Sequence, residues 1–132
     1  MIATSPSDAP GIAPAEDDPA VIDEDHLARM TLGDRALERE VLEIFARQTV
    51  IMLQRIGGAE PALAAAAAHT LVGSARGIGA TRVALAAERL EQAARGKAGA
   101  AELDRAVDAL KAATVEASAA IAARLGSALR DH

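Results

Sequence analysis

Cysteine is absent from the 132 residues, and Phe45 is the single aromatic residue. Without cysteine the chain has no disulfide scaffold, no thiolate zinc site and no cysteine nucleophile. With one aromatic ring it has no platform on which several bases or sugars could stack. Nineteen acidic against fourteen basic residues give a net charge of −5. This acidic balance argues against nucleic acid as the main partner.

Long apolar runs are also missing. The most apolar stretch, residues 63–68, is mostly alanine and far shorter than the about 20 residues that a membrane span needs. The N-terminus lacks the basic start and apolar core of a signal peptide. We therefore expect a cytoplasmic protein that makes no membrane contact.

Proline divides the chain into two parts. Four of the five prolines lie in the first nineteen residues, so residues 1–20 are predicted to be a disordered tail and residues 21–132 one folded domain. Good helix formers dominate after Pro61, which predicts an all-α fold. Capping residues and glycines place helices at about 22–30, 34–55, 61–76, 81–95 and 101–128. Short loops then favour an up-down antiparallel four-helix bundle with a short leading helix.

Apolar side chains at helical spacing indicate which positions form the core. The expected core residues are Leu37, Val41, Ile44, Phe45, Met52 and Ile56 on the second helix, Val83, Ala87, Leu90 and Ala94 on the fourth, and Leu103, Val107, Leu110, Thr114, Ala117, Ile121 and Leu125 on the last.

His69 occupies an unusual position on the third helix. At about 100° per residue, its side chain points about 150° away from the centre of the predicted core side. That core side holds Leu63, Ala67, Thr70, Leu71, Ser74 and Ile78. The face around His69 is predicted to hold Ala62, Ala65, Ala66, Val72, Gly73 and Arg76. The pattern predicts a docking surface of small residues around an exposed imidazole.

Glycine at position 73 supports that prediction. In a helix interior glycine costs about 0.5–1 kcal/mol relative to alanine, which a helix accepts where another molecule must approach closely. Simpler alternatives remain open. Helix propensity alone accounts for the alanines, an early helix end accounts for Gly73, and His69 is then a solvated surface residue.

A lone exposed imidazole suits few reactions. Metal binding needs several ligands, and the spacing does not bring His26 or His132 to His69. We therefore expect no metal or cofactor site. No serine has the partners of a hydrolytic triad. Nucleophilic chemistry by His69 itself remains, because a neutral imidazole is available near neutral pH.

The segment from His69 to Ala80, His-Thr-Leu-Val-Gly-Ser-Ala-Arg-Gly-Ile-Gly-Ala, resembles the signature of histidine-containing phosphotransfer (HPt) domains. The resemblance covers about residues 21–95 and includes the stretches 32–34, 40–45 and 88–91. HPt domains are four-helix-bundle phosphocarriers of bacterial and fungal multistep phosphorelays. The resemblance implies that His69 takes a phosphoryl group from an aspartate of one receiver domain and passes it to an aspartate of another. The implied partners are response-regulator receiver domains, which supply magnesium, and a hybrid sensor histidine kinase; we expect the carrier to be a monomer.

The resemblance also implies roles for neighbouring residues. Gly73 lets the receiver approach, and Glu91 orients the imidazole through its other ring nitrogen, with Glu88 one turn earlier. The family usually has lysine three residues after the histidine, where this chain has Val72.

Arg76 is expected to replace that lysine in offsetting phosphate charge, because seven residues return it to within about 20° of His69. Arg95 is a second candidate. For all of these charged residues, an ordinary solvated surface is the alternative.

The chain has no glycine-rich phosphate loop and is too short for a kinase domain, so we expect no ATP-dependent autophosphorylation. An alternative function is a phosphorylation-independent module that binds or sequesters a receiver, and Val72 favours it. A purely structural or ligand-binding bundle is a third possibility, in which His69 has no role.

Overall fold

The computed structural model describes residues 20–58, 60–96 and 98–130. The predicted N-terminal tail, residues 1–20, lies outside the described residues except for Ala20. The described residues contain no strand, and they form the helices α2 (Glu24–Met30), α3 (Arg35–Ile56), α4 (Pro61–Ile78), α5 (Thr81–Arg95) and α6 (Ala100–Arg130). The all-α prediction is confirmed, with helix ends within two residues of those expected.

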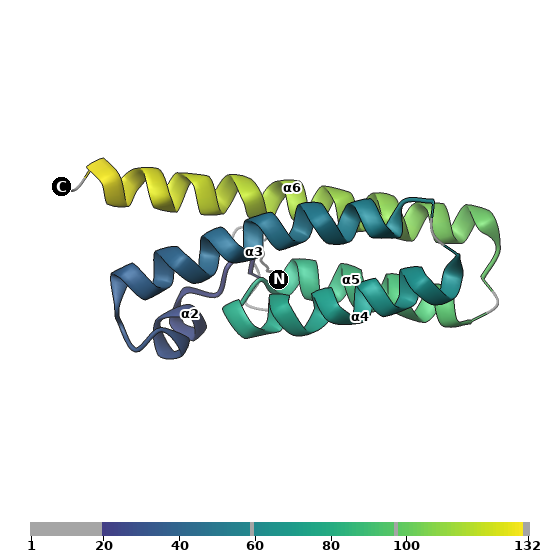
Figure 1. Cartoon of the computed structure of the whole chain (residues 1–132), viewed down its shortest axis with the longest axis horizontal. Helices are drawn as coiled ribbons and strands as arrows, with labels where there is room; N and C mark the ends of the chain where they lie inside the picture. Colours follow the sequence, from purple (N-terminus) through teal and green to yellow (C-terminus); the bar gives the residue numbers. More distant parts are fainter. Residues whose placement is uncertain (1–19, 59, 97, 131–132) are drawn as a thin grey trace, which may run out of the picture.

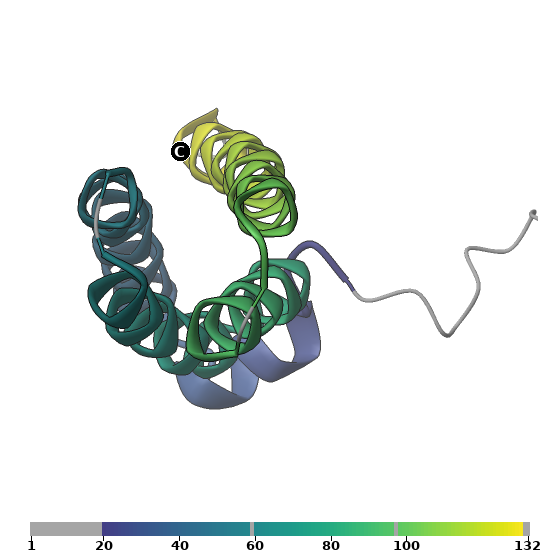
Figure 2. The ribbon, with the colours of Figure 1, turned by 90° about the vertical axis from the view of Figure 1, so that its right-hand side faces the viewer.

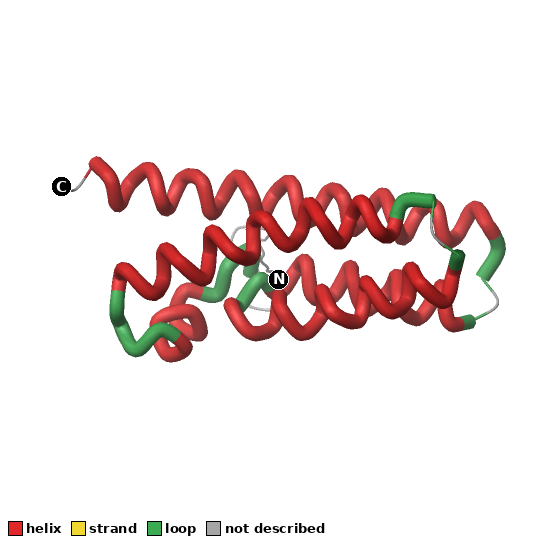
Figure 3. The backbone as a smooth tube through the Cα atoms, in the orientation of Figure 1, coloured by secondary structure: helices red, strands yellow, loops and turns green. Residues whose placement is uncertain are grey.

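The four long helices form an antiparallel bundle (Figure 1). Seen end on, α3, α4, α5 and α6 follow one another around a curve in chain order, and the short α2 packs against α4 (Figure 2). Short turns connect the helices in the described segments (Figure 3). This is the four-helix bundle with a leading helix that the sequence predicts. In this bundle α4 lies between α3 and α5 and contacts both.

Local signals in the sequence begin and end the helices. Asp23 and Asp34 cap α2 and α3 by accepting backbone hydrogen bonds through their side chains. The helix α4 continues two residues past the expected end and stops at Gly79, whose φ of 85° favours glycine. A Cβ at Gly79 would lie 2.9 Å from the carbonyl oxygen of Asp23. The turn after α4 therefore packs closely against the residue that precedes α2.

The predicted core is correct on the last two helices and partly wrong on α3. All four positions expected on α5 are buried, and the seven on α6 are buried or half-buried. On α3, Leu37 and Ile44 are 38% and 48% exposed, whereas Leu42 is fully buried. The buried stripe of α3 runs through Leu42, Phe45, Thr49, Met52 and Ile56. Phe45, Met52 and Ile56 are therefore buried as expected, and the prediction is wrong only at the positions nearer the start of the helix.

An arginine joins three of the helices at one end of the bundle. Arg124 of α6 donates two hydrogen bonds to the carboxylate of Glu38 on α3, from Nε at 2.8 Å and from Nη2 at 3.0 Å. Its Nη1 donates to Glu24 of α2 at 2.7 Å. The hydrogen bonds that Arg124 donates to Glu38 and Glu24 raise its pKa above the usual value. The cluster therefore fixes the long α6 against α3 and α2.

Within the described residues, no helix combines the length and the apolar character needed to cross a membrane.

Candidate functional site

The exposed face of α4 agrees only in part with the one expected. Ala65 and Val72, predicted to lie on the docking surface, are buried, with exposed fractions of 1% and 7%. Leu63 and Thr70, predicted to face the core, are exposed. The reason is that α4 packs against both α3 and α5, so its buried side is wide and extends toward α5. Ala62 and Ala66 are exposed as expected.

His69 lies at the edge of this exposed face and contacts α5. Its side chain is 71% exposed, and its Nδ1 lies 3.0 Å from Oε2 of Glu91. A carboxylate can only accept a hydrogen bond, so the contact fits an imidazole whose hydrogen is on Nδ1. The lone pair of Nε2 is then available to an incoming group. The predicted partnership of His69 with Glu91 is present in the structure.

Glu91 is itself held in place. Its side chain is 17% exposed, and Nε of Arg95 donates to the same Oε2 atom at 3.0 Å. One carboxylate oxygen thus accepts from both an imidazole and a guanidinium group. Exposed ion pairs contribute about 0–1 kcal/mol to stability, so the pair of Arg95 with Glu91 adds little to the stability of the fold.

A second ion pair lies two turns further along α4. Nη2 of Arg76 donates to Oε2 of Glu88 at 2.5 Å, and the Arg76 side chain is 60% exposed. Glu88, the alternative partner for the imidazole, binds Arg76 instead. The sequence pattern did not predict this pair. The signal available for it was the antiparallel contact of α4 with α5, which brings residue 76 opposite residue 88 just as it brings 69 opposite 91.

Gly73 lies between His69 and Arg76 on the exposed face. A Cβ built there would meet no atom within 4 Å outside its own chain neighbours and helix backbone. Its backbone is helical, so neither internal packing nor backbone conformation requires glycine. The missing side chain instead leaves open space one turn from the imidazole.

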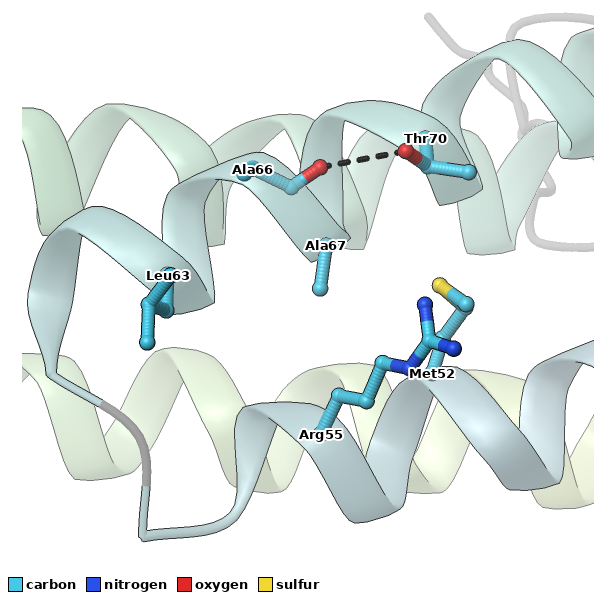
Figure 4. A pocket seen from close by; sticks show the side chains of 6 residues that line it. All are labelled: Met52, Arg55, Leu63, Ala66, Ala67 and Thr70. Carbon is cyan, nitrogen blue, oxygen red and sulfur yellow. Dashed lines mark hydrogen bonds between the residues drawn. The ribbon is translucent and has the colours of Figure 1, made fainter.

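A shallow groove of about 350 Å³ runs between α3 and α4 (Figure 4). It is lined by Met52, Arg55, Leu63, Ala66, Ala67 and Thr70. The hydroxyl of Thr70 donates back to the carbonyl of Ala66 at 3.2 Å, which leaves a mainly apolar lining. Ile44 and Ile51 of α3 are about half exposed. The polar contact of the imidazole is therefore with α5, whereas the groove lies on the side of α4 that faces α3.

No group of three or more histidine, aspartate or glutamate side chains in the described segments is arranged to hold a metal ion. His26 lies on α2, where its Nε2 is 3.2 Å from the carbonyl oxygen of Gly77, and His132 is outside the described residues.

Comparison with known proteins identifies a family. Residues 39–121 match the family model of the Hpt domain. Neither the comparison with curated proteins nor that with solved structures gives a match. The matched segment covers more than half of the chain and includes all of α4 and α5, with His69 and its contacts. The chain therefore belongs to the Hpt domain family, whose members carry out histidine phosphotransfer in two-component signalling.

Proposed function

We propose that this chain is a phosphorelay intermediate that accepts a phosphoryl group on His69 from a receiver-domain aspartate and passes it to an aspartate of another receiver. The observation that supports this most is the contact of Nδ1 of His69 with Glu91, made while the ring is 71% exposed. The contact orients the imidazole and leaves Nε2 accessible. These are the two properties that a nucleophile needs for attack on a partner's phosphate.

In the proposed step, the lone pair of Nε2 attacks the phosphorus of the aspartyl phosphate. A nitrogen–phosphorus bond forms, the bond from phosphorus to the aspartate oxygen breaks, and the aspartate leaves as a carboxylate. The imidazole gains positive charge, which the Glu91 carboxylate stabilises through Nδ1–H. Attack by the next receiver's aspartate reverses these changes. The receivers contribute the magnesium that offsets phosphate charge during transfer.

Arg76 is the proposed cation for the phosphorylated state. A phosphoryl group on His69 carries up to two negative charges, and a guanidinium can bind it through parallel hydrogen bonds. Val72, at the position of the family's usual lysine, is apolar and 7% exposed, so it supplies no charge. Arg76 is on the same helix face and largely exposed.

We further propose that receivers dock on the groove between α3 and α4. The groove is close to His69 along α4, since Ala66, about one turn before His69, and Thr70, the next residue, both line it. Its mainly apolar lining suits a modest interface that forms and dissociates readily, and Ile44 and Ile51 are further exposed apolar side chains of α3. Gly73 then lies under the approaching receiver.

The variant His69→Gln tests the proposal and has the largest expected effect. We expect wild-type protein to take up acid-labile, base-stable phosphate on His69 from phosphoramidate or from a phosphorylated receiver, and to pass it to a second receiver. His69→Gln should take up none, with a free energy of unfolding within about 0.5 kcal/mol of wild type, because the side chain is exposed. Mass spectrometry locates the phosphate and urea unfolding measures stability.

The same experiment distinguishes the sequestering alternative. Wild-type protein that takes up no phosphate from either donor, but binds receivers as tightly as His69→Gln does, would overturn the carrier function. It would leave a phosphorylation-independent binding module.

A further inference from the structure

We infer that Glu88 restrains Arg76 in the unphosphorylated protein, and that a phosphoryl group on His69 takes Arg76 away from it. The inference rests on the proposed function of His69. Its starting observation is that Arg76, the cation expected to serve His69, is bound to a carboxylate of α5 instead, through Nη2 and Oε2 of Glu88. The bond from Nη2 to Glu88 therefore competes with the parallel hydrogen bonds that Arg76 would make to a phosphate.

The geometry of α4 allows Arg76 to make this move. Seven residues separate it from His69, which is about 10.5 Å along the helix axis. Long side chains in helices lean toward the N-terminal end, so that of Arg76 extends back over the preceding turn. The residue in that turn on the same face is Gly73, where a Cβ would meet nothing within 4 Å. The space between the guanidinium and a phosphorylated imidazole is therefore open.

The balance of charges favours the exchange once His69 is phosphorylated. The present partner is a single carboxylate on a side chain that is 37% exposed, opposite a guanidinium that is 60% exposed. Such a solvated pair contributes little to stability. A phosphoryl group offers more charge and several acceptor oxygens, and it binds guanidinium more strongly. Arg76 is therefore expected to bind Glu88 before phosphorylation and the phosphoryl group after it.

The other nearby arginine is differently placed. Arg95 donates to the same Oε2 atom of Glu91 that contacts His69. Movement of Arg95 would disturb the carboxylate that orients the imidazole. Movement of Arg76 leaves the contact between His69 and Glu91 intact. The arrangement therefore gives the positioning of His69 to Glu91 and Arg95, the binding of phosphate to Arg76, and the restraint of Arg76 to Glu88.

The test is the lifetime of phosphohistidine in Glu88→Gln. Full-length protein is phosphorylated with phosphoramidate, the donor is removed, and loss of phosphate from His69 is followed by mass spectrometry. Without the competing carboxylate, Arg76 should stabilise the phosphoryl group more effectively. We expect loss to slow by about two- to fivefold, the factor that corresponds to an exposed ion pair.

Two further variants show whether the effect passes through Arg76. In an Arg76→Ala background, Glu88→Gln should change the lifetime no further, as a double-mutant cycle requires for coupled residues. Glu116→Gln removes the same charge from another exposed ion pair, that of Glu116 with Arg82, and should leave the lifetime unchanged.

The outcomes separate the inference from the function on which it rests. No phosphate on His69 of wild-type protein would overturn the proposed function and this inference with it. Phosphate on His69 with equal lifetimes in wild type and Glu88→Gln would overturn the inference alone. So would a slower loss in Glu88→Gln that persists without Arg76, since it would reflect general charge repulsion.

Discussion

Two of the groups of charged residues that join helices in the described part of the chain differ in which side-chain atoms they leave exposed. At one end of the bundle, Arg124 donates three hydrogen bonds to Glu38 and Glu24, and its side chain is 30% exposed. On α4 and α5, Glu91 accepts from His69 and Arg95, and the imidazole is 71% exposed. In each cluster one central side chain, Arg124 or Glu91, binds two partners. Only the second presents an accessible nitrogen to a partner.

The difference separates a structural role from a chemical one. The guanidinium of Arg124 uses Nε, Nη1 and Nη2 within the molecule and links α2, α3 and α6. His69 uses Nδ1 within the molecule, and its ring is open to solvent at the other nitrogen. We therefore expect changes in the first cluster to alter the stability of the fold, and changes in the second to alter phosphotransfer.

Glu91→Ala should have the larger effect of the variants that test this contrast. Loss of the carboxylate removes the group that orients the imidazole, and losses of comparable supporting partners reduce activity about 10- to 100-fold. We expect a reduction of this size in the rate at which His69 accepts phosphate from a receiver, with little change in stability. Rapid-quench measurements of the transfer give the rate.

Glu91→Gln is the matched variant. Its amide oxygen can still accept the hydrogen of Nδ1 but carries no charge, so it should recover part of the rate. If Glu91→Ala transfers phosphate as fast as wild type, then Glu91 does not position His69.

Arg124→Met should have the opposite pattern. The substitution retains an apolar stem but leaves Glu38, which is 21% exposed, without its two hydrogen bonds. We expect the free energy of unfolding to fall by about 1–2 kcal/mol, measured by urea denaturation, with transfer to His69 unchanged in the folded protein.

Arg124→Lys keeps the charge and loses the paired geometry, so its stability should lie between those of wild type and Arg124→Met. Transfer that falls more than the folded fraction does would contradict the division of roles between the two clusters.

The sequence predicted the parts of this molecule that depend on local signals. Asp23, Asp34 and Gly79 have the chemistry of helix ends, and the structure places α2, α3 and α4 accordingly. On α5 and α6 the large apolar residues stand out from polar neighbours, so the core side could be identified. The exposure of His69 was also expected, although the predicted core side of α4 was rotated by part of a turn from the observed one.

The exposed face of α4 was predicted only in part, because its alanine-rich composition gives little contrast between buried and exposed positions. Residues 64–68 are all alanine, and alanine is equally acceptable inside and outside. The predicted core side therefore included Leu63, which is 63% exposed, and Ala65 and Val72 were predicted to be exposed although both are buried. Close packing of small residues against α5 decided their burial. The pairing of Arg76 with Glu88 depends on the same contact between α4 and α5, and the sequence pattern did not predict the details of that contact.

Gly73→Ala should give the smallest change and the sharpest contrast, since stability and transfer are expected to move in opposite directions. Alanine in a helix interior stabilises by about 0.5–1 kcal/mol relative to glycine, and the added Cβ meets nothing within 4 Å. Urea unfolding should show this gain. Transfer from a receiver should fall by up to about tenfold, because the methyl group alters the close approach on which alignment depends.

Phosphoramidate separates the two effects, since a small donor needs no docking surface and should phosphorylate Gly73→Ala at the wild-type rate. Gly126→Ala is the matched control, because a Cβ at Gly126 of α6 also meets nothing within 4 Å. It should leave transfer from a receiver unchanged, so any loss of transfer there would point to helix rigidity in general. If Gly73→Ala gains stability and keeps full transfer from a receiver, the partner does not approach closely at this turn, and Gly73 is then simply a weak position in the helix.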